Sequence, residues 1–254
     1  MYRRSAEAVL GRVVQRVDAP DAYYIKGGVS PAQLAEVLVG RTVTGTERIG
    51  KLLLLDLDHE RHALGLRFGM SGRIVVDENA VIETLQYSSG RDDPAWDRFA
   101  LHFESPGGTL RINDPRRLGG VELAPDVTKL GVDLFQATPA AVRDHVVSSS
   151  VALKARLLDQ RSIAGIGNLL ADEILWRAGL DPARPANSLT VAETERLSRH
   201  IRSVARQMLA KGGSHMGRLQ PARERRGRCP RDQTELERRT IGGRTSYSCP
   251  LHQV

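Results

Sequence analysis

Four side chains that can bind metals form two pairs near the C-terminus. Cys229 and Asp232 form the first pair, and Cys249 and His252 form the second, each with two residues between its members. Two knuckles of this spacing on a hairpin are typical of a zinc ribbon, and all four side chains are competent zinc ligands. The pattern predicts one structural zinc ion, with a metal-free hairpin held by its own packing as the alternative. Because the chain has only these two cysteines, a disulfide-stapled secreted scaffold is excluded.

A second chemical pattern is the segment LLDQRSIAGIGN, residues 157–168. One helix ends there, Gly165 and Gly167 permit tight turns, and Asn168 begins a new helix whose free N–H groups point outward. Such a terminus binds phosphate, and we expect Asn168 to add a side-chain donor and Lys154 to supply a charge. A helix-turn-helix corner without a ligand would use glycine in the same way.

Positive charge is concentrated toward the C-terminus. The net charge is +7, from 37 Lys and Arg against 30 Asp and Glu. Residues 211–254 hold ten basic and four acidic residues, which is +6 of that total, and nine of the ten are arginine. Arginine makes bidentate contacts to phosphates and bases, so we expect a nucleic-acid partner. A basic tail without a function is the alternative.

The elements that must position these residues change along the chain. Up to about residue 125, short apolar segments separated by turn residues predict an antiparallel β-sandwich or barrel. We expect a helix within it that starts from a capping box at Ser30 and ends near Gly40, and another helix at residues 2–10. The predicted strands are 41–43, 51–58, 64–76, 98–103, 109–112 and 120–123.

After about residue 130 the hydrophobic period becomes 3.6, which predicts a helical bundle. Its helices are expected at 138–147, 152–160, 168–178 and 190–210. The fold class is therefore α+β, with a β-sandwich domain at 1–125, a helical domain at 126–212, and a basic loop with a hairpin at 213–254. The longest apolar run is four residues, 52–55, so we expect a soluble, intracellular protein without a membrane span.

Residues 157–182, LLDQRSIAGIGNLLADEILWRAGLDP, resemble the helix-two-turn-helix motif of the formamidopyrimidine-DNA glycosylase and endonuclease VIII family. Further segments resemble that family in the same order and spacing: GKLLL at 50–54, FGMSG at 68–72, NDPRRLG at 113–119 and GRTSYSCP at 243–250. The resemblance covers nearly the whole chain. It implies a bilobal, monomeric DNA glycosylase with class I AP lyase activity in base-excision repair, acting on damaged duplex DNA in the cleft between its lobes. Base flipping is implied, because a glycosidic bond inside a stacked duplex is out of reach.

The resemblance also implies roles for residues of the first domain. Met70, Arg116 and Leu118 match the trio that fills the gap left by the flipped nucleotide. The family usually has Phe at the position of Leu118, so the preference for the opposite base stays open. Without the resemblance, Met70 would be interpreted as a core or turn residue. Arg98 lies where the family commonly has a DNA-contacting histidine.

Two cationic residues are expected to act in catalysis. On spacing alone, Lys51 at the start of an apolar strand would be a snorkelling lysine. The resemblance implies instead that Lys51 contacts the phosphate beside the lesion and assists proton transfer in strand cleavage. It also implies that Arg244, beyond the turn at Gly242 and Gly243, grips the flanking phosphates and assists the second elimination. In the family all four zinc ligands are cysteines, so the present ligand set departs from it.

The family's nucleophile is the secondary amine of an N-terminal proline, which is followed by a glutamate acid. This chain begins Met1-Tyr2-Arg3-Arg4 and has neither residue at its start. Either the assigned start lies downstream of the true one, or the nucleophile has been lost and the chain is a silent lesion or abasic-site binder. A residual lyase through a primary amine, of Met1 or Lys51, would be slow.

A third hypothesis is a non-specific nucleic-acid-binding protein, which would show no preference for abasic over intact duplex. No motif for ATP, flavin or nicotinamide is present, so no nucleotide cofactor is expected. The composition is typical of bacteria, and we expect a cytoplasmic, nucleoid-associated protein.

Overall fold

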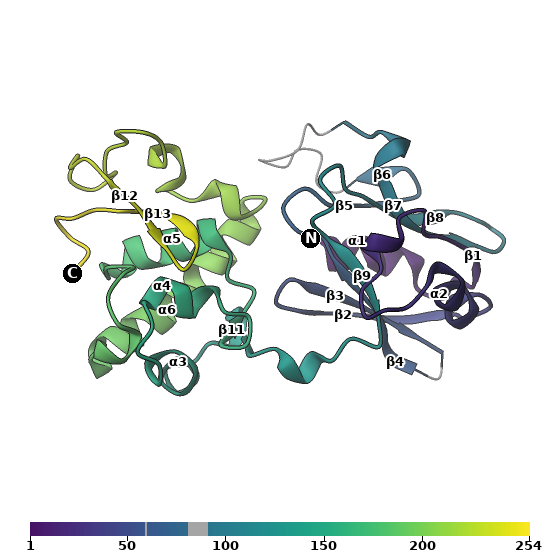
Figure 1. Ribbon diagram of the computed structural model, residues 1–254, viewed down its shortest axis with the longest axis horizontal. Helices are drawn as coiled ribbons and strands as arrows, with labels where there is room; N and C mark the ends of the chain where they lie inside the picture. The colour runs from purple at the N-terminus through teal and green to yellow at the C-terminus, as the bar shows by residue number, and fades with distance from the viewer. Residues whose placement is uncertain (59, 81–90) are drawn as a thin grey trace. The chain divides into compact units, whose positions relative to one another are not determined.

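The computed structural model describes residues 1–58, 60–80 and 91–254, which form two compact units, Met1–Val127 and Thr128–Val254 (Figure 1). Each unit has its own hydrophobic core. The mixture of helix and sheet confirms the predicted α+β class. Within the described residues, no helix is both long and apolar enough to cross a membrane.

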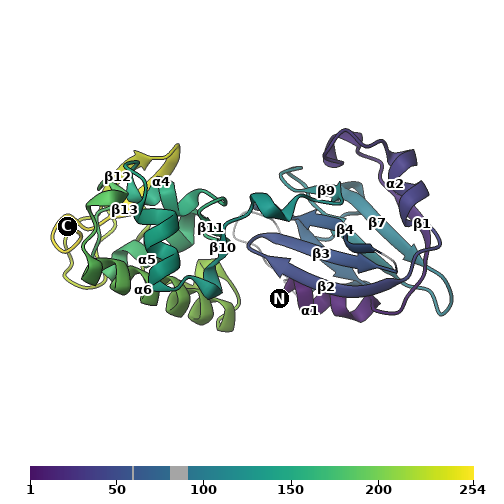
Figure 2. The ribbon, with the colours of Figure 1, turned by 90° about the horizontal axis from the view of Figure 1, so that it is seen from below.

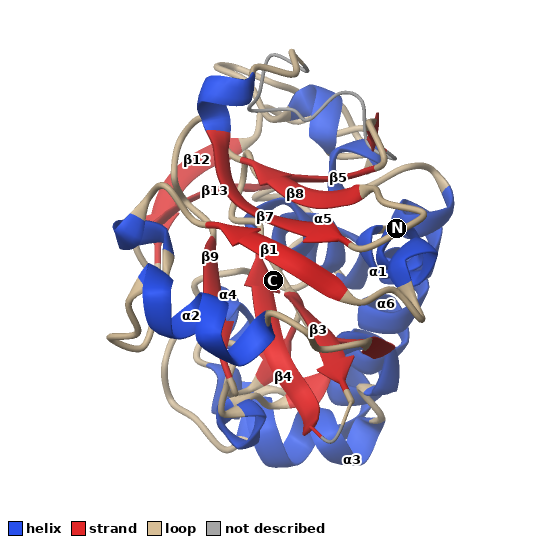
Figure 3. Ribbon diagram, turned by 90° about the vertical axis from the view of Figure 1, so that its right-hand side faces the viewer, coloured by secondary structure: helices blue, strands red, loops and turns tan. Residues whose placement is uncertain are grey.

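The first unit is a sandwich of two antiparallel sheets, in agreement with the sequence pattern. One sheet has the strand order β1-β7-β8-β5-β6, and the other has the order β2-β3-β4-β9. Helix α2 lies beside the edge strand β1 (Figure 3). The elements of this unit are α1 (Tyr2–Ala6), β1 (Val14–Asp18), α2 (Pro31–Leu38), β2 (Val43–Ile49), β3 (Leu52–Leu57), β4 (Glu60–Arg67), β5 (Arg73–Val76), β6 (Asn79–Ala80), β7 (Asp97–Phe103), β8 (Thr109–Asn113) and β9 (Gly120–Leu123).

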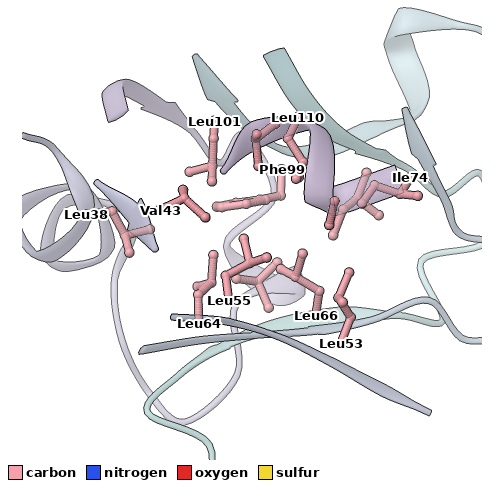
Figure 4. Packing of buried hydrophobic residues seen from close by; sticks show 14 of the residues in the cluster. Leu38, Val43, Leu53, Leu55, Leu64, Leu66, Ile74, Phe99, Leu101 and Leu110 are labelled. Atoms are coloured by element: carbon pink, nitrogen blue, oxygen red, sulfur yellow. The ribbon is translucent and has the colours of Figure 1, made fainter. Parts of the chain in front are cut away.

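The core of the first unit lies between its two sheets. Burial of each large apolar side chain there contributes about 1.5–3 kcal/mol. Because side chains alternate along a strand, every second residue of the central strands faces this core. From one sheet and the other, the side chains that meet are Leu53, Leu55, Leu64 and Leu66 opposite Ile74, Phe99, Leu101 and Leu110 (Figure 4).

Local signals predicted some elements of this unit and missed others. The capping box at Ser30 is formed, and it starts α2 as expected. The predicted segment 64–76 is two strands, β4 and β5, because the turn between them includes Gly69 in the left-handed region (φ 57°). Strand β1 and most of β2 were not predicted. Both are edge strands on which only the first residue is fully buried, so their sequences lack apolar alternation.

The second unit is built around two helices that pack side by side, α5 (Asn168–Ala178) and α6 (Val191–Ala210), as Figure 2 shows. Both have the bounds that the sequence predicted, apart from the capping residue Thr190 of α6. The predicted helix at 138–147 consists of α3 (Pro139–Val142) followed by a π-helical turn, and the one at 152–160 is the shorter α4 (Leu153–Leu158). A two-stranded parallel ladder joins β10 (Val132–Asp133) to β11 (Ile163–Ala164).

The C-terminal segment forms the expected hairpin. Strands β12 (Glu237–Ile241) and β13 (Arg244–Ser248) are joined by Gly242 and Gly243, whose φ angles of 58° and 70° suit the tight turn of a two-residue hairpin. A small apolar cluster that includes Trp176 of α5 and the two cysteines packs this segment onto the helical part of the unit.

Candidate functional site

A buried carboxylate joins two exposed loops of the first unit. Asp114 is fully buried. Its Oδ1 accepts hydrogen bonds from Ser71 Oγ (2.5 Å) and from the backbone N–H of Arg116 (3.3 Å). Its Oδ2 accepts from the N–H of Gly119 (2.8 Å) and from the hydroxyl of Tyr24 (3.1 Å). Since one side chain closes both the 68–72 turn and the 113–119 loop, the geometry of the two loops is coupled.

These two loops carry the predicted gap-filling residues. Met70 and Leu118 are 52% and 44% exposed, and Arg116 is exposed as well, so two apolar side chains and one charged side chain stand in water on adjoining loops. The loops touch directly, because a Cβ atom on Gly69 would lie 2.6 Å from the carbonyl carbon of Leu118. Gly69 also has a positive φ, so another residue would strain the backbone and push the loops apart. The first unit thus brings the predicted trio together.

The other two predicted residues of this unit are Arg98, on a strand, and Lys51, in a turn between two strands. Arg98 is half-buried in β7 and donates from Nε to the backbone carbonyl of Asp114 (3.0 Å), so it braces the 113–119 loop. Lys51 is exposed in the turn between β2 and β3, next to Gly50 in the left-handed region (φ 57°). Helix α1 reaches the 68–72 turn through Tyr2, whose hydroxyl donates to the carbonyl of Gly72 (2.9 Å).

In the second unit, the predicted phosphate site is the start of α5. The helix begins at Asn168 after Gly167, and no described side chain caps it, so its first N–H groups are available to a ligand. Gly165 has a φ of 109°, which gives the tight turn that the sequence predicted, whereas the prediction of a tight turn at Gly167 was wrong, because its backbone is extended (φ −110°, ψ 176°). The Oδ1 atom of Asn168 is buried and has no hydrogen-bond partner among the described residues. This oxygen is an acceptor and cannot bind a phosphate oxygen itself, so a phosphate contact from this side chain would have to come from its Nδ2 group.

Arg244 lies exposed at the start of β13, directly after the hairpin turn. The turn is seated on α4, because a Cβ on Gly242 would lie 2.9 Å from the Cβ of Ala155. The next residue, Thr245, is also tied to α4, since its carbonyl accepts a hydrogen bond from Lys154 Nζ (2.9 Å). Helix α4 therefore sets the position of the turn that carries Arg244.

The position of Lys154 departs from the expectation that it supplies charge directly to a phosphate. Its side chain is fully buried, and Nζ lies 2.7 Å from Oδ1 of Asp172. Its ammonium also donates to the carbonyl of Thr245, so its hydrogen bonds are made inside the protein. A buried lysine bonded in this way does not reach a phosphate on the surface.

The four predicted metal ligands converge at the C-terminal hairpin. One ligand atom from each of Cys229, Asp232, Cys249 and His252 lies within 4.8 Å of all the others. The closest approaches are 3.0 Å from His252 Nδ1 to Asp232 Oδ2, 3.4 Å from Cys249 Sγ to the same oxygen, and 3.7 Å from Cys229 Sγ to His252 Nδ1. This cluster could hold a metal ion.

The family of this chain follows from its similarity to known proteins. Residues 1–121 match the formamidopyrimidine-DNA glycosylase N-terminal domain, and residues 130–218 match the formamidopyrimidine-DNA glycosylase H2TH domain. The formamidopyrimidine-DNA glycosylase of Chloroflexus aggregans is 33% identical over 246 residues, which is 88% of this chain and 85% of that protein. This chain belongs to the formamidopyrimidine-DNA glycosylase family. The family indicated by the sequence motifs is thereby confirmed.

Other members of the formamidopyrimidine-DNA glycosylase family are similar over nearly their whole length. The enzyme of Paracoccus denitrificans is 32% identical over 273 residues, covering 96% of this chain and 93% of that protein. The Lactococcus lactis formamidopyrimidine-DNA glycosylase bound to DNA with an AP site has a TM-score of 0.80 at 24% identity, covering 99% of this chain and 96% of that one. A complex of the Lactococcus lactis protein with DNA containing FAPY-dG has a TM-score of 0.79 at 24% identity, with the same coverage. These structures have the same fold.

Two buried carboxylates that organise the candidate site of this family member, Asp114 and Asp172, were not predicted from sequence. Asp114 lies in the motif NDPRRLG, which indicated the family but gave this residue no role of its own, and its burial depends on distant partners such as Tyr24. Asp172 lies on the buried face of α5. A carboxylate among apolar helix positions signals that a buried cation must be near, and that signal could have paired it with Lys154.

Proposed function

We propose that this protein is a base-excision-repair DNA glycosylase and AP lyase that binds duplex DNA at a damaged or abasic nucleotide. The observation that carries the proposal is the exposed apolar pair Met70 and Leu118, held on loops that share Asp114, in a chain of net charge +7. Apolar side chains of DNA-binding proteins can insert between stacked bases and partly unstack them. The names of the relatives, and the abasic-site and FAPY-dG DNA in the Lactococcus lactis complexes, support the same partner.

In this proposal the first unit opens the base stack. Extruding a nucleotide costs a few kcal/mol, and less at a damaged or abasic position, which gives the protein one source of selectivity. Met70 and Leu118 occupy the vacated space, and Arg116 contacts the polar edge of the orphaned base. The buried carboxylate of Asp114 keeps the two loops in register, so little ordering remains to be done on binding.

The second unit holds the phosphates beside the lesion. The first N–H groups of α5, the amide of Asn168 and the backbone at Gly167 form a neutral donor set at the positive end of a helix dipole. Arg244 adds a charged, bidentate donor from the hairpin turn. Lys51 and Arg98 of the first unit supply further contacts, with Lys51 assisting proton transfer. In a bacterial cell, the DNA that such a set of contacts would bind is the duplex DNA of the nucleoid.

The reaction begins when an amine attacks C1′ of the nucleotide. The bond from C1′ to the base breaks and the base leaves with a proton; the C1′–O4′ bond then opens, O4′ takes up a proton, and the amine nitrogen, having given up its own proton, forms the C=N bond of an imine at C1′. Loss of a C2′ proton then breaks the bond to the 3′ phosphate oxygen and cuts the strand. An upstream Pro-Glu start in frame would supply the secondary amine of the family. Within the described residues, the ε-amino group of Lys51, exposed in the turn between β2 and β3, is a candidate amine.

We also propose that the hairpin holds one structural zinc ion. In a tetrahedral site with bonds of about 2.0–2.3 Å, donor atoms lie about 3.3–3.8 Å apart. The three shortest separations here are 3.0–3.7 Å, and all four donor atoms lie within 4.8 Å of one another. The indole N–H of Trp176 donates to Cys229 Sγ (3.3 Å), and the carbonyl of Trp176 lies 3.2 Å from His252 Nε2. These contacts turn the sulfur and Nδ1 toward the cluster, as outer contacts of a metal site do. Zinc would tie the two knuckles together.

The test is borohydride trapping on duplex DNA with one true abasic site. The present chain is compared with a version extended upstream to an in-frame Pro-Glu start, and Lys51→Met is made in both. A covalent adduct that forms with the extended chain and survives Lys51→Met supports an ordinary glycosylase. An adduct of the present chain that Lys51→Met abolishes assigns the imine to Lys51. No adduct with either chain, while an abasic analogue is still bound preferentially, would identify a silent lesion-binding relative.

A further inference from the structure

A group of three buried charges links α4, α5 and the 213–227 loop in the second unit. Lys154 Nζ lies 2.7 Å from Oδ1 of Asp172, and the guanidinium of Arg223 donates to Oδ2 of the same carboxylate through Nε (3.0 Å) and Nη2 (2.8 Å). The exposed fractions of the three side chains are 0%, 0% and 7%. We call these three residues the charge triad.

The charge triad carries one more positive than negative charge. Two cations share one carboxylate, and burial lowers the pKa of Lys154 in spite of its contact with Asp172. An excess charge of this kind is costly to bury and is retained only where its hydrogen bonds are well satisfied. Because this buried excess charge is costly, we ask which segment of the protein the charge triad binds.

The charge triad makes hydrogen bonds to strand β13, at the residues directly after Arg244. Lys154 donates to the carbonyl of Thr245 (2.9 Å). Ser246 Oγ donates to Oδ1 of Asp172 (3.1 Å), and the N–H of Tyr247 donates to Oδ2 (3.3 Å).

Arg223 completes the set by lying over the ring of Tyr247, 5.2 Å from its centroid. Three successive residues of β13 are thus fastened to one buried group. Asp172 lies one helical turn after Asn168, the first residue of α5. A rigid connection therefore runs from the start of α5, through the charge triad, to the turn that carries Arg244.

We propose that the charge triad is a positioning device that fixes Arg244 relative to the N-terminus of α5, so that both grip one stretch of DNA backbone. Lys154 is then a positioning residue that acts through Thr245 and touches no phosphate. The inference rests on the proposed function for what Arg244 binds. The attachment of β13 to α5 can be tested independently of that function, because it exists in the protein without DNA.

Two other roles for Lys154 make different predictions. If Lys154 left the interior and contacted a phosphate itself, its loss and the loss of Arg244 would weaken binding independently, and their effects would add. If Lys154 served only the stability of the fold, its removal would lower the melting temperature without changing DNA affinity below that temperature. Positioning predicts a loss of affinity that depends on Arg244.

The experiment is a double-mutant cycle of Lys154→Met and Arg244→Ala, read as affinity for a duplex with a tetrahydrofuran abasic analogue. Met keeps the length of the lysine stem, and Asp172 remains paired with Arg223. We expect Lys154→Met to weaken binding by about tenfold, and the double variant to bind no more weakly than Arg244→Ala alone. Additive losses would overturn the proposal, as would unchanged affinity of Lys154→Met. Lys129→Met, which removes an exposed lysine of the same unit outside the basic segment 211–254, is the matched control for loss of one charge.

Hydrogen exchange of the free protein gives a second readout that does not involve DNA. In Lys154→Met, the amides of residues 242–247 should exchange faster while those of α6 keep their protection. If Lys154→Met does not fold, Ser246→Ala takes its place, since it removes only one buried hydroxyl from Asp172. Faster exchange and weaker binding are again expected, and unchanged values for both would overturn the proposal. If the variant exchanges faster but the unaltered protein shows no preference for abasic-site DNA, the link between the charge triad and β13 is supported and the proposed function is refuted.

Discussion

Met70 and Leu118 are large apolar side chains exposed to water beside Arg116. If Met70 fills the space of a flipped nucleotide, its contact is made only where a nucleotide has left the stack. We therefore expect Met70→Ala to lower affinity for an abasic-analogue duplex by about tenfold, equivalent to about 1.4 kcal/mol, and to leave affinity for intact duplex unchanged. Fluorescence anisotropy with both DNAs measures this. Leu209→Ala, at an exposed leucine of α6, is the control, and equal losses on both DNAs would contradict gap filling.

Arg244 and Asn168 are expected to bind phosphate in different ways, one with a charge and one without. For the unaltered protein, neutralising about five phosphates gives a slope of log K against log[salt] of about −4 to −5. Arg244→Ala should weaken lesion binding and make the slope shallower by about 0.9, because one counterion fewer is released. Asn168→Ala should weaken binding at an unchanged slope. Titrations at several salt concentrations check this, and unchanged affinity in both variants would refute the proposed footprint.

Single residues also mark the limit of prediction from sequence. The gap-filling trio and the four metal ligands could be named because each lies in a short segment with a recognisable pattern. Lys154 was given a direct role because its place near the glycine turn is visible in sequence, whereas its burial against Asp172 is not. Asp114 was missed for the same reason, since its partners lie up to 90 residues away. Buried polar groups are determined by tertiary contacts that no local pattern contains.

At the scale of elements, the start of α6 combines a capping box with an ion pair. Thr190 and Glu193 form a capping box, and Glu193 also accepts two hydrogen bonds from Arg184 (2.7 and 2.8 Å). The hydrogen bonds from Arg184 are the main reason that the pKa of Glu193 falls from 4.5 to about 2. Because the folded pKa is the lower one, the ionised carboxylate stabilises the fold above pH 4.5, and this contribution is lost as the pH falls toward 2.

Glu193→Gln should therefore lower the melting temperature at neutral pH and reduce its dependence on pH between about 4.5 and 2. The amide can still accept a hydrogen bond from the N–H of Thr190, so the change removes charge more than it removes the cap. Thermal unfolding monitored by circular dichroism at a series of pH values is the measurement. Glu195→Gln, at an exposed position of the same helix, is the matched control. Identical pH profiles for the two variants would refute this account of α6.

The hairpin element is expected to depend on its metal. Native mass spectrometry of the purified protein should show one zinc ion, and a chelator or Cys249→Ser should remove it and lower the melting temperature, because metal binding is coupled to folding of the ribbon. Asp232→Asn should weaken metal retention with a smaller loss of stability, since an amide is a poorer ligand than a carboxylate. A metal-free protein whose melting temperature is insensitive to the chelator would show that packing alone holds the hairpin.

Elements with strong periodicity and explicit start signals were predicted well, as α2, α5 and α6 show. Elements whose stability comes from neighbours were not. The edge strands β1 and β2 bury few side chains and pair because the adjacent strands offer hydrogen-bonding groups. Pairing of this kind leaves almost no trace in sequence.

At the scale of the whole molecule, the family was accessible from sequence because five motifs occur in the right order over most of the chain. The two units and their separate cores agree with a change of hydrophobic period near residue 130. We propose that paired loops in the first unit recognise the lesion and that a helix start and a hairpin in the second unit bind phosphate. Only the loops are expected to distinguish an unusual nucleotide from a normal duplex, because phosphate contacts are made to both.

The most direct measurement is the affinity of this protein for a short duplex with one tetrahydrofuran abasic analogue, compared with the same duplex intact, at a fixed salt concentration. The account predicts tighter binding to the abasic analogue by at least about tenfold, because only that duplex admits the side chains of the two loops at a low unstacking cost. Equal affinities would contradict it and would leave a basic protein that binds nucleic acid without regard to damage.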